Sequence, residues 1–238
     1  LMFVISSYAV NPSLSYAKAY DFFRFTIVFL FIYLCLVDIK KYNLFIWLCV
    51  LCCMYLSYQA WAHPEYRVAG RLEGMGTPDS ANANHFAILL VTFVPYIVSI
   101  TLYGKWFEKC AALVGGLFVL NGIVICGGVR ADHNVYLLLL VEQSIVGLIL
   151  FLLFLWKSIN MLRRLNKKIL HIPYQPGSDL QFIKYHSTAT IAALTGVMVG
   201  SFFTERLYYE PLYFIAAIPC VLEKCFQDNV RDHETAGQ

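Results

Sequence analysis

The sequence predicts an all-α fold, a polytopic transmembrane helical bundle. Of its 238 residues, 59% are hydrophobic, and the mean hydropathy is +0.63; an average soluble domain is about 45–50% apolar. Charged residues make up only 14% of the chain, against roughly 25% in soluble domains. These charges cluster in short stretches between long apolar runs, which is typical of a chain that crosses a bilayer several times.

About seven apolar runs approach the length of roughly 20 residues that a membrane span requires. They are continuously apolar rather than alternating, so they predict helices and not the strands of a barrel. The opening stretch LMFVISSYAV is too short to span, and we expect a partial helix there and no signal peptide. One transmembrane domain over residues 1–238 is therefore expected. The predicted spans are 22–37, 44–62, 85–103, 110–126, 135–156, 186–203 and 207–222.

Lysine and arginine residues predict the orientation of this bundle, because short cytoplasmic loops are enriched in both. The basic stretches DIKKYN, KWFEK and the segment 157–185 all fall on one side of the predicted spans. We therefore expect 157–185 to be a basic cytoplasmic loop. The opposite, outer side then receives the loop 63–84 and the short segment 127–134.

The eight cysteines do not indicate a metal or redox site. Most lie inside apolar runs, and the CxxC pair Cys49 and Cys52 is flanked by LFIWL and MYLSY. A thiol in such surroundings behaves as a small hydrophobic group, so we interpret the cysteines as structural.

The outer loop 63–84 has a composition that suits an anion. It carries Arg67, Arg71 and three glycines, which allow tight turns and a close approach of the backbone to a ligand. Asn82 or Asn84 can cap the helix that we expect to follow. Guanidinium groups and the free N–H groups of a helix N-terminus both favour phosphate. The alternative is an ordinary exposed loop with a helix cap.

The outer segment 127–134 contains Arg130 and His133, next to the start of a predicted span. Ionisable residues at membrane depth are costly and tend to be functional, and a histidine exchanges its proton near neutral pH. The alternative is a histidine that merely caps a helix or lies at the membrane interface. Together with the arginines of the first loop, His133 is a candidate catalytic residue.

The sequence contains no motif for several other kinds of chemistry. It contains no Walker-type phosphate loop, no HExxH, no GxSxG and no DxD pair that would hold a divalent metal. Its basic stretches lack interleaved aromatic residues, so nucleic-acid binding is not expected.

In these two outer segments the sequence resembles the O-antigen ligase family of bacterial lipid-linked-glycan ligases and polymerases. GRLEGMGTPDSANANHFAILLVTFVP is similar to the family's Arg, spaced Gly, Asp and Asn before Phe-Ala and an apolar helix. GGVR is similar to its Ser-Arg-Gly segment, and DHNVYLLLLVEQSIVGLILF to its His-Asn, Tyr-Leu, Glu and Gly-Leu pattern. The resemblance covers about residues 63–156. The central spans and large periplasmic loop of the family are missing between the last two segments.

The resemblance implies a GT-C-like glycosyltransferase in the bacterial inner membrane, with its active face toward the periplasm. Its donor would be an undecaprenyl-pyrophosphate-linked glycan, and its acceptor would be lipid A–core or another glycan. Neither a metal nor another cofactor would be required. The implied partners are thus the lipid-linked donor, the glycan acceptor and membrane lipids.

The resemblance also assigns roles to individual residues. His133 would take the proton of the acceptor hydroxyl as general base, or would orient the acceptor. Arg130, beside it, would offset the charge that develops on the pyrophosphate. The substrate-binding residues would be Arg71, Arg67 as a weaker candidate, and Asn82 and Asn84, which would shape the loop.

Several alternative functions remain open from the sequence. An O-antigen polymerase and a protein O-oligosaccharyltransferase share the family pattern and differ only in their acceptor. A lipid-linked glycan transporter predicts internal repeats and broken helices, and we find no convincing repeat. A membrane scaffold would explain the spans but would leave Arg71, Arg130 and His133 without a reason to cluster.

Overall fold

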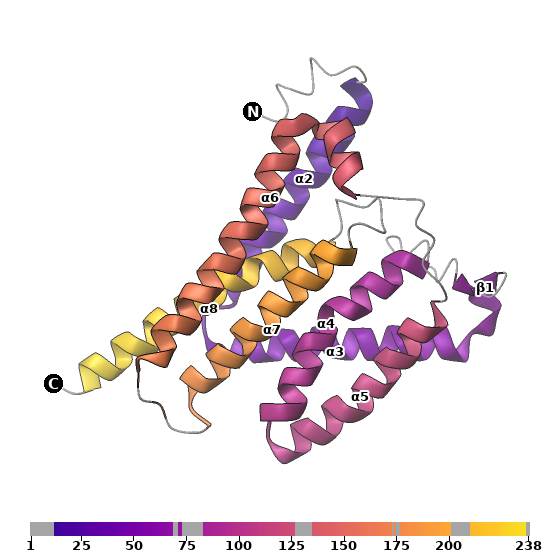
Figure 1. Cartoon of the computed structure of the whole chain (residues 1–238). Helices are drawn as coiled ribbons and strands as arrows, with labels where there is room; N and C mark the ends of the chain where they lie inside the picture. Colours follow the sequence, from indigo (N-terminus) through magenta and orange to yellow (C-terminus); the bar gives the residue numbers. More distant parts are fainter. Residues whose placement is uncertain are drawn as a thin grey trace.

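The computed structural model describes residues 12–68, 71–72, 83–126, 135–172, 174, 177–200 and 210–236. Within these ranges the chain is helical apart from one pair of two-residue strands, so the predicted all-α class is confirmed (Figure 1). The helices are α2 (Pro12–Cys35), α3 (Ile39–Ala62), α4 (Ala83–Tyr103), α5 (Trp106–Ile125), α6 (Val135–Leu170), α7 (Asp179–Gly200) and α8 (Glu210–Ala236). The short elements are the 3₁₀ helix η1 (Pro64–Tyr66) and the strands β1 (Arg67–Val68) and β2 (Arg71–Leu72).

Three of the described helices are long and apolar enough to cross a membrane: α3, α5 and the part of α4 from Phe86 to Tyr103. The predicted number of about seven spans is therefore not confirmed. In α2 the apolar stretch is shorter, Phe23–Cys35. The sequences of α7 and α8 contain polar stretches that lower their hydropathy, KYHSTAT in α7 and DNVRDHETA in α8.

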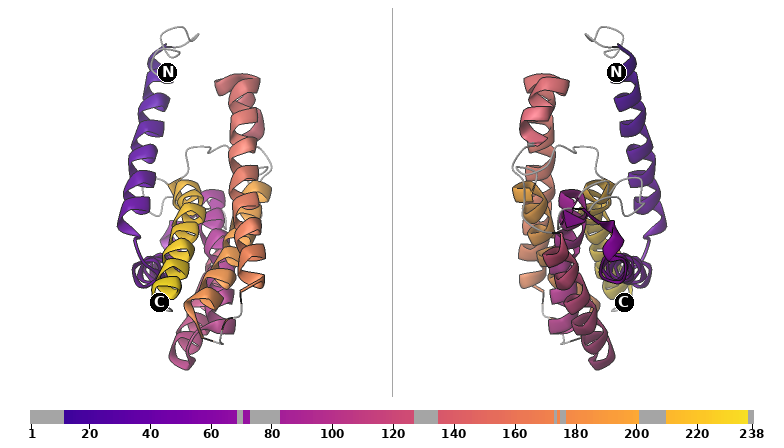
Figure 2. Two further views of the ribbon diagram at one scale, coloured as in Figure 1. Left: turned by 90° about the vertical axis from the view of Figure 1, so that its left-hand side faces the viewer. Right: turned by 90° about the vertical axis from the view of Figure 1, so that its right-hand side faces the viewer.

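The helices pack around α4, which contacts α5 on one side and α7 on the other. Helix α3 packs against α4 and α5, and α8 packs against α2, α6 and α7. In Figure 1, α2 and α6 overlap, but the turned views of Figure 2 show them on opposite sides of the bundle. Both project beyond the other helices, so the packed centre of the fold consists of α3, α4, α5, α7 and the buried part of α8.

Helix ends are set by capping residues and by short turns. The carboxylate of Asp38 accepts a hydrogen bond from the backbone N–H of Lys41 at 2.8 Å and caps α3. Helix α3 ends before Pro64, which has no N–H to donate. Between α4 and α5 only Gly104 and Lys105 intervene, and Glu108 accepts from the Lys105 N–H at 2.7 Å. This tight turn makes α4 and α5 antiparallel neighbours.

Close contacts at two glycines of α5 establish the direction of the central helices. A side chain added at Gly115 would meet Met54 of α3, and one at Gly122 would meet Ser57 of α3 at 2.6 Å and Leu90 of α4 at 2.8 Å. The later glycine of α5 therefore contacts the later residue of α3, so the two helices run parallel. Since α4 runs opposite to α5, the end of α3, the start of α4 and the end of α5 lie at one end of the bundle.

Two ends of the bundle follow from these directions. We call the end with the hairpin β1–β2, the start of α4 and the end of α5 the arginine end, after Arg67 and Arg71. We call the end with the start of α3, the α4–α5 turn and the start of α7 the lysine end, after Lys40 and Lys105. Helix α7 is antiparallel to α4, because a Cβ added at Gly200 would lie 3.3 Å from the side chain of Ile88, near the start of α4.

The basic stretch after residue 157 is helical, unlike the loop that we predicted over 157–185. Helix α6 continues to Leu170, and α7 begins at Asp179. The reason is an apolar face within the basic stretch: Leu162, Leu165 and Ile169 are fully buried, at the spacing of one side of a helix. The connection between α6 and α7 is therefore shorter than predicted.

Candidate functional site

At the arginine end the chain leaves α3 and forms a small antiparallel hairpin. In this hairpin Arg67 pairs with Leu72, and Val68 pairs with Arg71. Leu72 retains only 2% of its surface and belongs to the hydrophobic core, so its burial holds the hairpin against the bundle. The hairpin thus places the backbones of Arg67 and Arg71 on neighbouring strands beside the start of α4 (Figure 1).

A hydrogen-bonded pair of side chains precedes the hairpin. Nδ1 of His63 lies 2.7 Å from Oε1 of Glu65, and the rings of His63 and Tyr66 are 5.6 Å apart. A backbone hydrogen bond at Glu65 and the hydrogen bond with His63 lower the pKa of the Glu65 carboxyl. Glu65 is therefore a carboxylate at neutral pH, and it lies two residues before Arg67.

The structure describes the backbone of three of the predicted site residues, Arg67, Arg71 and Asn84, and places them at the arginine end. Asn84 is the second residue of α4, close to the predicted helix start. Three further predicted residues lie outside the described residues: Asn82, Arg130 and His133. The segment with Arg130 and His133 starts at this same end, because it follows Cys126, which is buried directly after α5.

A buried polar cluster between α3, α4 and α7 escaped the sequence analysis. The hydroxyl of Tyr42 lies 3.1 Å from Nδ1 of His186. The hydroxyl of Tyr96 donates to Oγ1 of Thr190 at 2.9 Å, and Thr190 donates to the carbonyl of His186 at 2.7 Å. The ring of Phe182 stacks on the imidazole with the centroids 4.0 Å apart. These contacts link three helices through groups that have almost no access to solvent.

A sequence signal for this cluster exists in the run HSTAT at 186–190, which opens the predicted span 186–203. Polar residues inside a span need partners within the protein, since the surrounding lipid offers none. No second residue at metal-ligand spacing accompanies His186 in the sequence, so no motif marks it. Its partners Tyr42 and Tyr96 come from distant helices, and only the packing brings them together.

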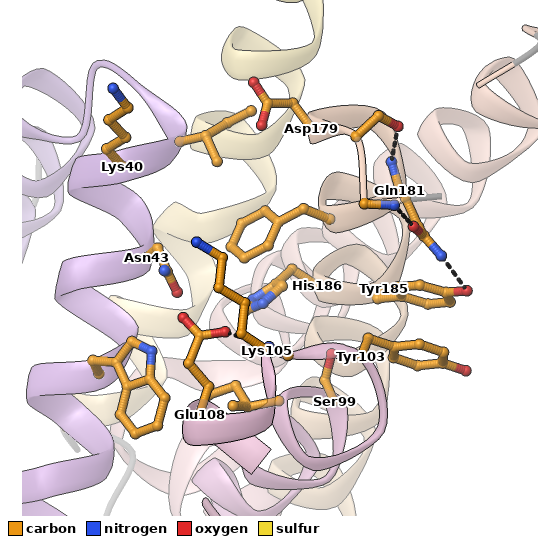
Figure 3. A pocket seen from close by; sticks show the side chains of 17 residues that line it. Lys40, Asn43, Ser99, Tyr103, Lys105, Glu108, Asp179, Gln181, Tyr185 and His186 are labelled. Atoms are coloured by element: carbon orange, nitrogen blue, oxygen red, sulfur yellow. Dashed lines mark hydrogen bonds between the residues drawn. The ribbon is translucent and has the colours of Figure 1, made fainter. Parts of the chain in front are cut away.

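A cavity of about 370 Å³ opens at the lysine end, between α3, α7 and the α4–α5 turn (Figure 3). Figure 3 shows Lys105 and Glu108 extending from the turn toward Asn43 of α3 and His186 of α7. His186 thus lines the cavity and also belongs to the buried polar cluster. The remaining charged and hydroxyl groups that line the cavity are Lys40, Asp179, Ser99, Ser178, Tyr103 and Tyr185.

Comparisons with known proteins do not place the chain in a family. No protein-family model matches it, and no curated protein or solved structure is similar to it. The function of this chain is therefore inferred from its own residues and their arrangement.

Proposed function

We propose that the chain is a metal-independent glycosyltransferase that moves a glycan from undecaprenyl pyrophosphate to an acceptor sugar such as that of lipid A–core. The proposal joins the motif resemblance of residues 63–156 to the geometry of the arginine end. The protein would lie in the bacterial inner membrane, with the arginine end toward the periplasm. Three helices that are long and apolar enough to cross a membrane support the membrane location.

The observation that carries the proposal is the common starting point of the two motif-bearing segments. The hairpin with Arg67 and Arg71 follows α3, and the segment with Arg130 and His133 follows α5. Because α3 and α5 run parallel and touch at Ser57 and Gly122, both segments start from the same end of the bundle. This common starting end supports the proposal that the two segments act on one substrate.

Arginine residues suit the leaving group of this reaction. As the glycosidic bond to phosphate breaks, its electron pair and negative charge pass to the lipid pyrophosphate. The planar guanidinium groups of Arg71 and Arg130 offset this charge through paired N–H···O bonds, which do not require a metal. Arg67 is held on the neighbouring strand and is a weaker candidate for the same role.

His133 acts as the general base in this proposal. It takes the proton of the acceptor hydroxyl while the hydroxyl oxygen forms a bond to the anomeric carbon. The bond between that carbon and the pyrophosphate oxygen breaks on the opposite side, so the configuration inverts. A positioned base of this kind contributes roughly 10²–10⁴-fold to a rate.

The test is a transfer assay with the full chain in proteoliposomes, an undecaprenyl-pyrophosphate-linked glycan as donor, and His133→Ala as the variant. We expect the variant to insert normally and to lose at least roughly 100-fold of the transfer rate. The matched control is His63→Ala, which removes a histidine at the same end that is already paired with Glu65; its rate should stay close to that of the native chain.

Normal glycan transfer by the His133→Ala variant would refute the assignment. Three acceptors distinguish the related activities: lipid A–core for a ligase, a second lipid-linked glycan for a polymerase, and an acceptor protein for an O-oligosaccharyltransferase. Absence of transfer to all three by the native chain would favour the transporter or the scaffold.

A further inference from the structure

The cavity at the lysine end contains a buried hydroxyl that has no partner. Ser99 of α4 lines the cavity and retains 7% of its surface, and its Oγ finds no hydrogen-bond partner among the described residues. The only hydrogen bond that the described part of the chain offers to the His186 ring is the one between Nδ1 and Tyr42. Buried polar groups are normally satisfied, so these groups indicate that the cavity receives a polar molecule.

Charges of both signs surround the same cavity. Lys40 and Lys105 supply ammonium groups, and no carboxylate of the described residues lies within ion-pair distance of either. Asp179, in the first turn of α7, is likewise without an ion pair within the described ranges. Figure 3 shows Lys40 and Asp179 at the rim and Lys105 closer to the centre. A ligand that carries both a phosphate and an ammonium would match this arrangement.

The mouth of the cavity lies at the level expected for the surface of the membrane. It opens where two of the apolar helices meet, at the turn between Tyr103 and Trp106. Trp106 and Phe107 on this turn are each 81% exposed, and they lie beside Lys105 and Lys109. Exposed aromatic residues next to lysines are typical of the interface between lipid headgroups and water, so phospholipid headgroups are at the level of the cavity mouth.

We propose that this cavity binds the phosphoethanolamine headgroup of a phospholipid, with the phosphate held by Lys40 and Lys105 and the ammonium by Asp179. The Ser99 hydroxyl supplies a further hydrogen-bond donor at the base of the cavity. Its volume of about 370 Å³ falls in the range of roughly 300–1,000 Å³ that small-molecule sites occupy. The site lies at the opposite end from the hairpin, and the proposal does not depend on glycan transfer.

The chemistry predicts which headgroups are selected. A primary ammonium has three N–H groups, which it can donate to Asp179, whereas the trimethylammonium of phosphocholine has none. Phosphatidylglycerol carries a phosphate without an ammonium, so it leaves the Asp179 carboxylate without a counter-charge. Phosphatidylethanolamine is therefore expected to bind more tightly than either of the other two lipids.

The experiment is native mass spectrometry of the full chain in detergent, titrated with three lipids of identical acyl chains: phosphatidylethanolamine, phosphatidylcholine and phosphatidylglycerol. We expect one phosphatidylethanolamine to bind about tenfold more tightly than the other two. Lys105→Gln should weaken this binding by roughly 10- to 100-fold, the effect of one hydrogen bond to a charged group. Lys109→Gln is the matched control, since Lys109 lies on the same turn and outside the cavity lining.

Asp179→Asn tests the ammonium subsite separately. This variant should bind phosphatidylethanolamine and phosphatidylcholine with nearly equal affinity, because the carboxylate that distinguishes the two headgroups is gone. Equal affinity of the native chain for all three lipids would overturn the proposal, and so would equal losses in Lys105→Gln and Lys109→Gln. Soluble phosphoethanolamine that binds as tightly as the lipid would overturn the membrane source of the ligand.

Discussion

The hydroxyl of Tyr42 lies 3.1 Å from Nδ1 of His186, although the two residues are 144 positions apart in the chain. Tyr42 belongs to the first turns of α3, and His186 to α7, and both are almost fully buried. Neither group can turn toward water if the other is removed. This contact therefore stabilises the packing of α3 against α7 next to the cavity at the lysine end.

Replacing Tyr42 by Phe should destabilise the protein, because it leaves the Nδ1 atom of His186 buried without a partner. The expected loss is about 1–3 kcal/mol in the free energy of unfolding, the penalty for one unsatisfied buried polar group. The measurement is denaturant-induced unfolding of the purified protein in detergent. Tyr55→Phe on the exposed face of α3 is the control, and an equal stability of both variants would contradict the prediction.

Replacing Gly122 by Ala should destabilise the contact between α3, α4 and α5. The added Cβ would lie 2.6 Å from Oγ of Ser57 and 2.8 Å from Cδ1 of Leu90, and such overpacking typically costs about 1–3 kcal/mol. Gly196→Ala in α7 should have the opposite sign, since its Cβ would meet only Val91 at 3.8 Å and Ala favours a helix by up to about 1 kcal/mol. Thermal unfolding of both variants measures these changes in stability. An increase in stability in Gly122→Ala would contradict the close packing of α3, α4 and α5 at this position.

The pKa of the Glu65 carboxyl should rise when His63 is replaced by Gln, but it should stay below its ordinary value. The backbone hydrogen bond at Glu65 is the larger cause of the lowered pKa and is retained, whereas the contribution of His63 is lost. A lowered carboxyl pKa stabilises the loop above the ordinary pKa, and this stabilisation is lost as the pH falls through the native value. Hence the Glu65 carboxyl should become protonated at a higher pH in the His63→Gln variant than in the native chain.

A carbon-13 NMR titration of labelled glutamate measures this shift. His171→Gln is a suitable control, because His171 is exposed and lies at the lysine end. An unchanged titration of Glu65 in the His63→Gln variant would show that the hydrogen bond between the two side chains does not form in solution.

The arginine end and the lysine end should face opposite sides of the membrane. In a variant without native cysteines, Glu65→Cys and Lys105→Cys would report the two ends to a membrane-impermeant thiol reagent. Lysine-rich ends are retained in the cytoplasm, so we expect Glu65→Cys to react from outside intact cells and Lys105→Cys only after permeabilisation. Reaction of both positions from one side would contradict the transmembrane arrangement of α3 and α4.

The positions of the helices were largely predictable, and their lengths were less so. The predicted spans 44–62, 110–126 and 186–203 each begin several residues after the start of the helix that they overlap, which is α3, α5 and α7 respectively. Hydropathy excludes charged first turns such as Ile39–Lys41, whereas the backbone is helical as soon as a cap satisfies its free N–H groups. For the same reason the basic part of α6 looked like a loop.

The candidate site was predictable only in part. The sequence placed Arg67, Arg71 and Asn84 on one side of the membrane, because loop order alone determines which side a segment reaches. It did not indicate the pairing of Arg67 with Leu72 or the burial of Leu72, which depend on side-chain packing against α4 and its neighbours. The roles proposed for Arg130 and His133 stay predictions that the transfer assay addresses.

Composition and periodicity predicted the helical class, and the seven expected spans included the three helices that are long and apolar enough to cross a membrane. These properties act locally along the chain. Packing between helices, in contrast, brings His186 to Tyr42 and places Lys40, Lys105 and Asp179 around one cavity. Such contacts join helices far apart in the chain, and their existence depends on which helix faces pack together.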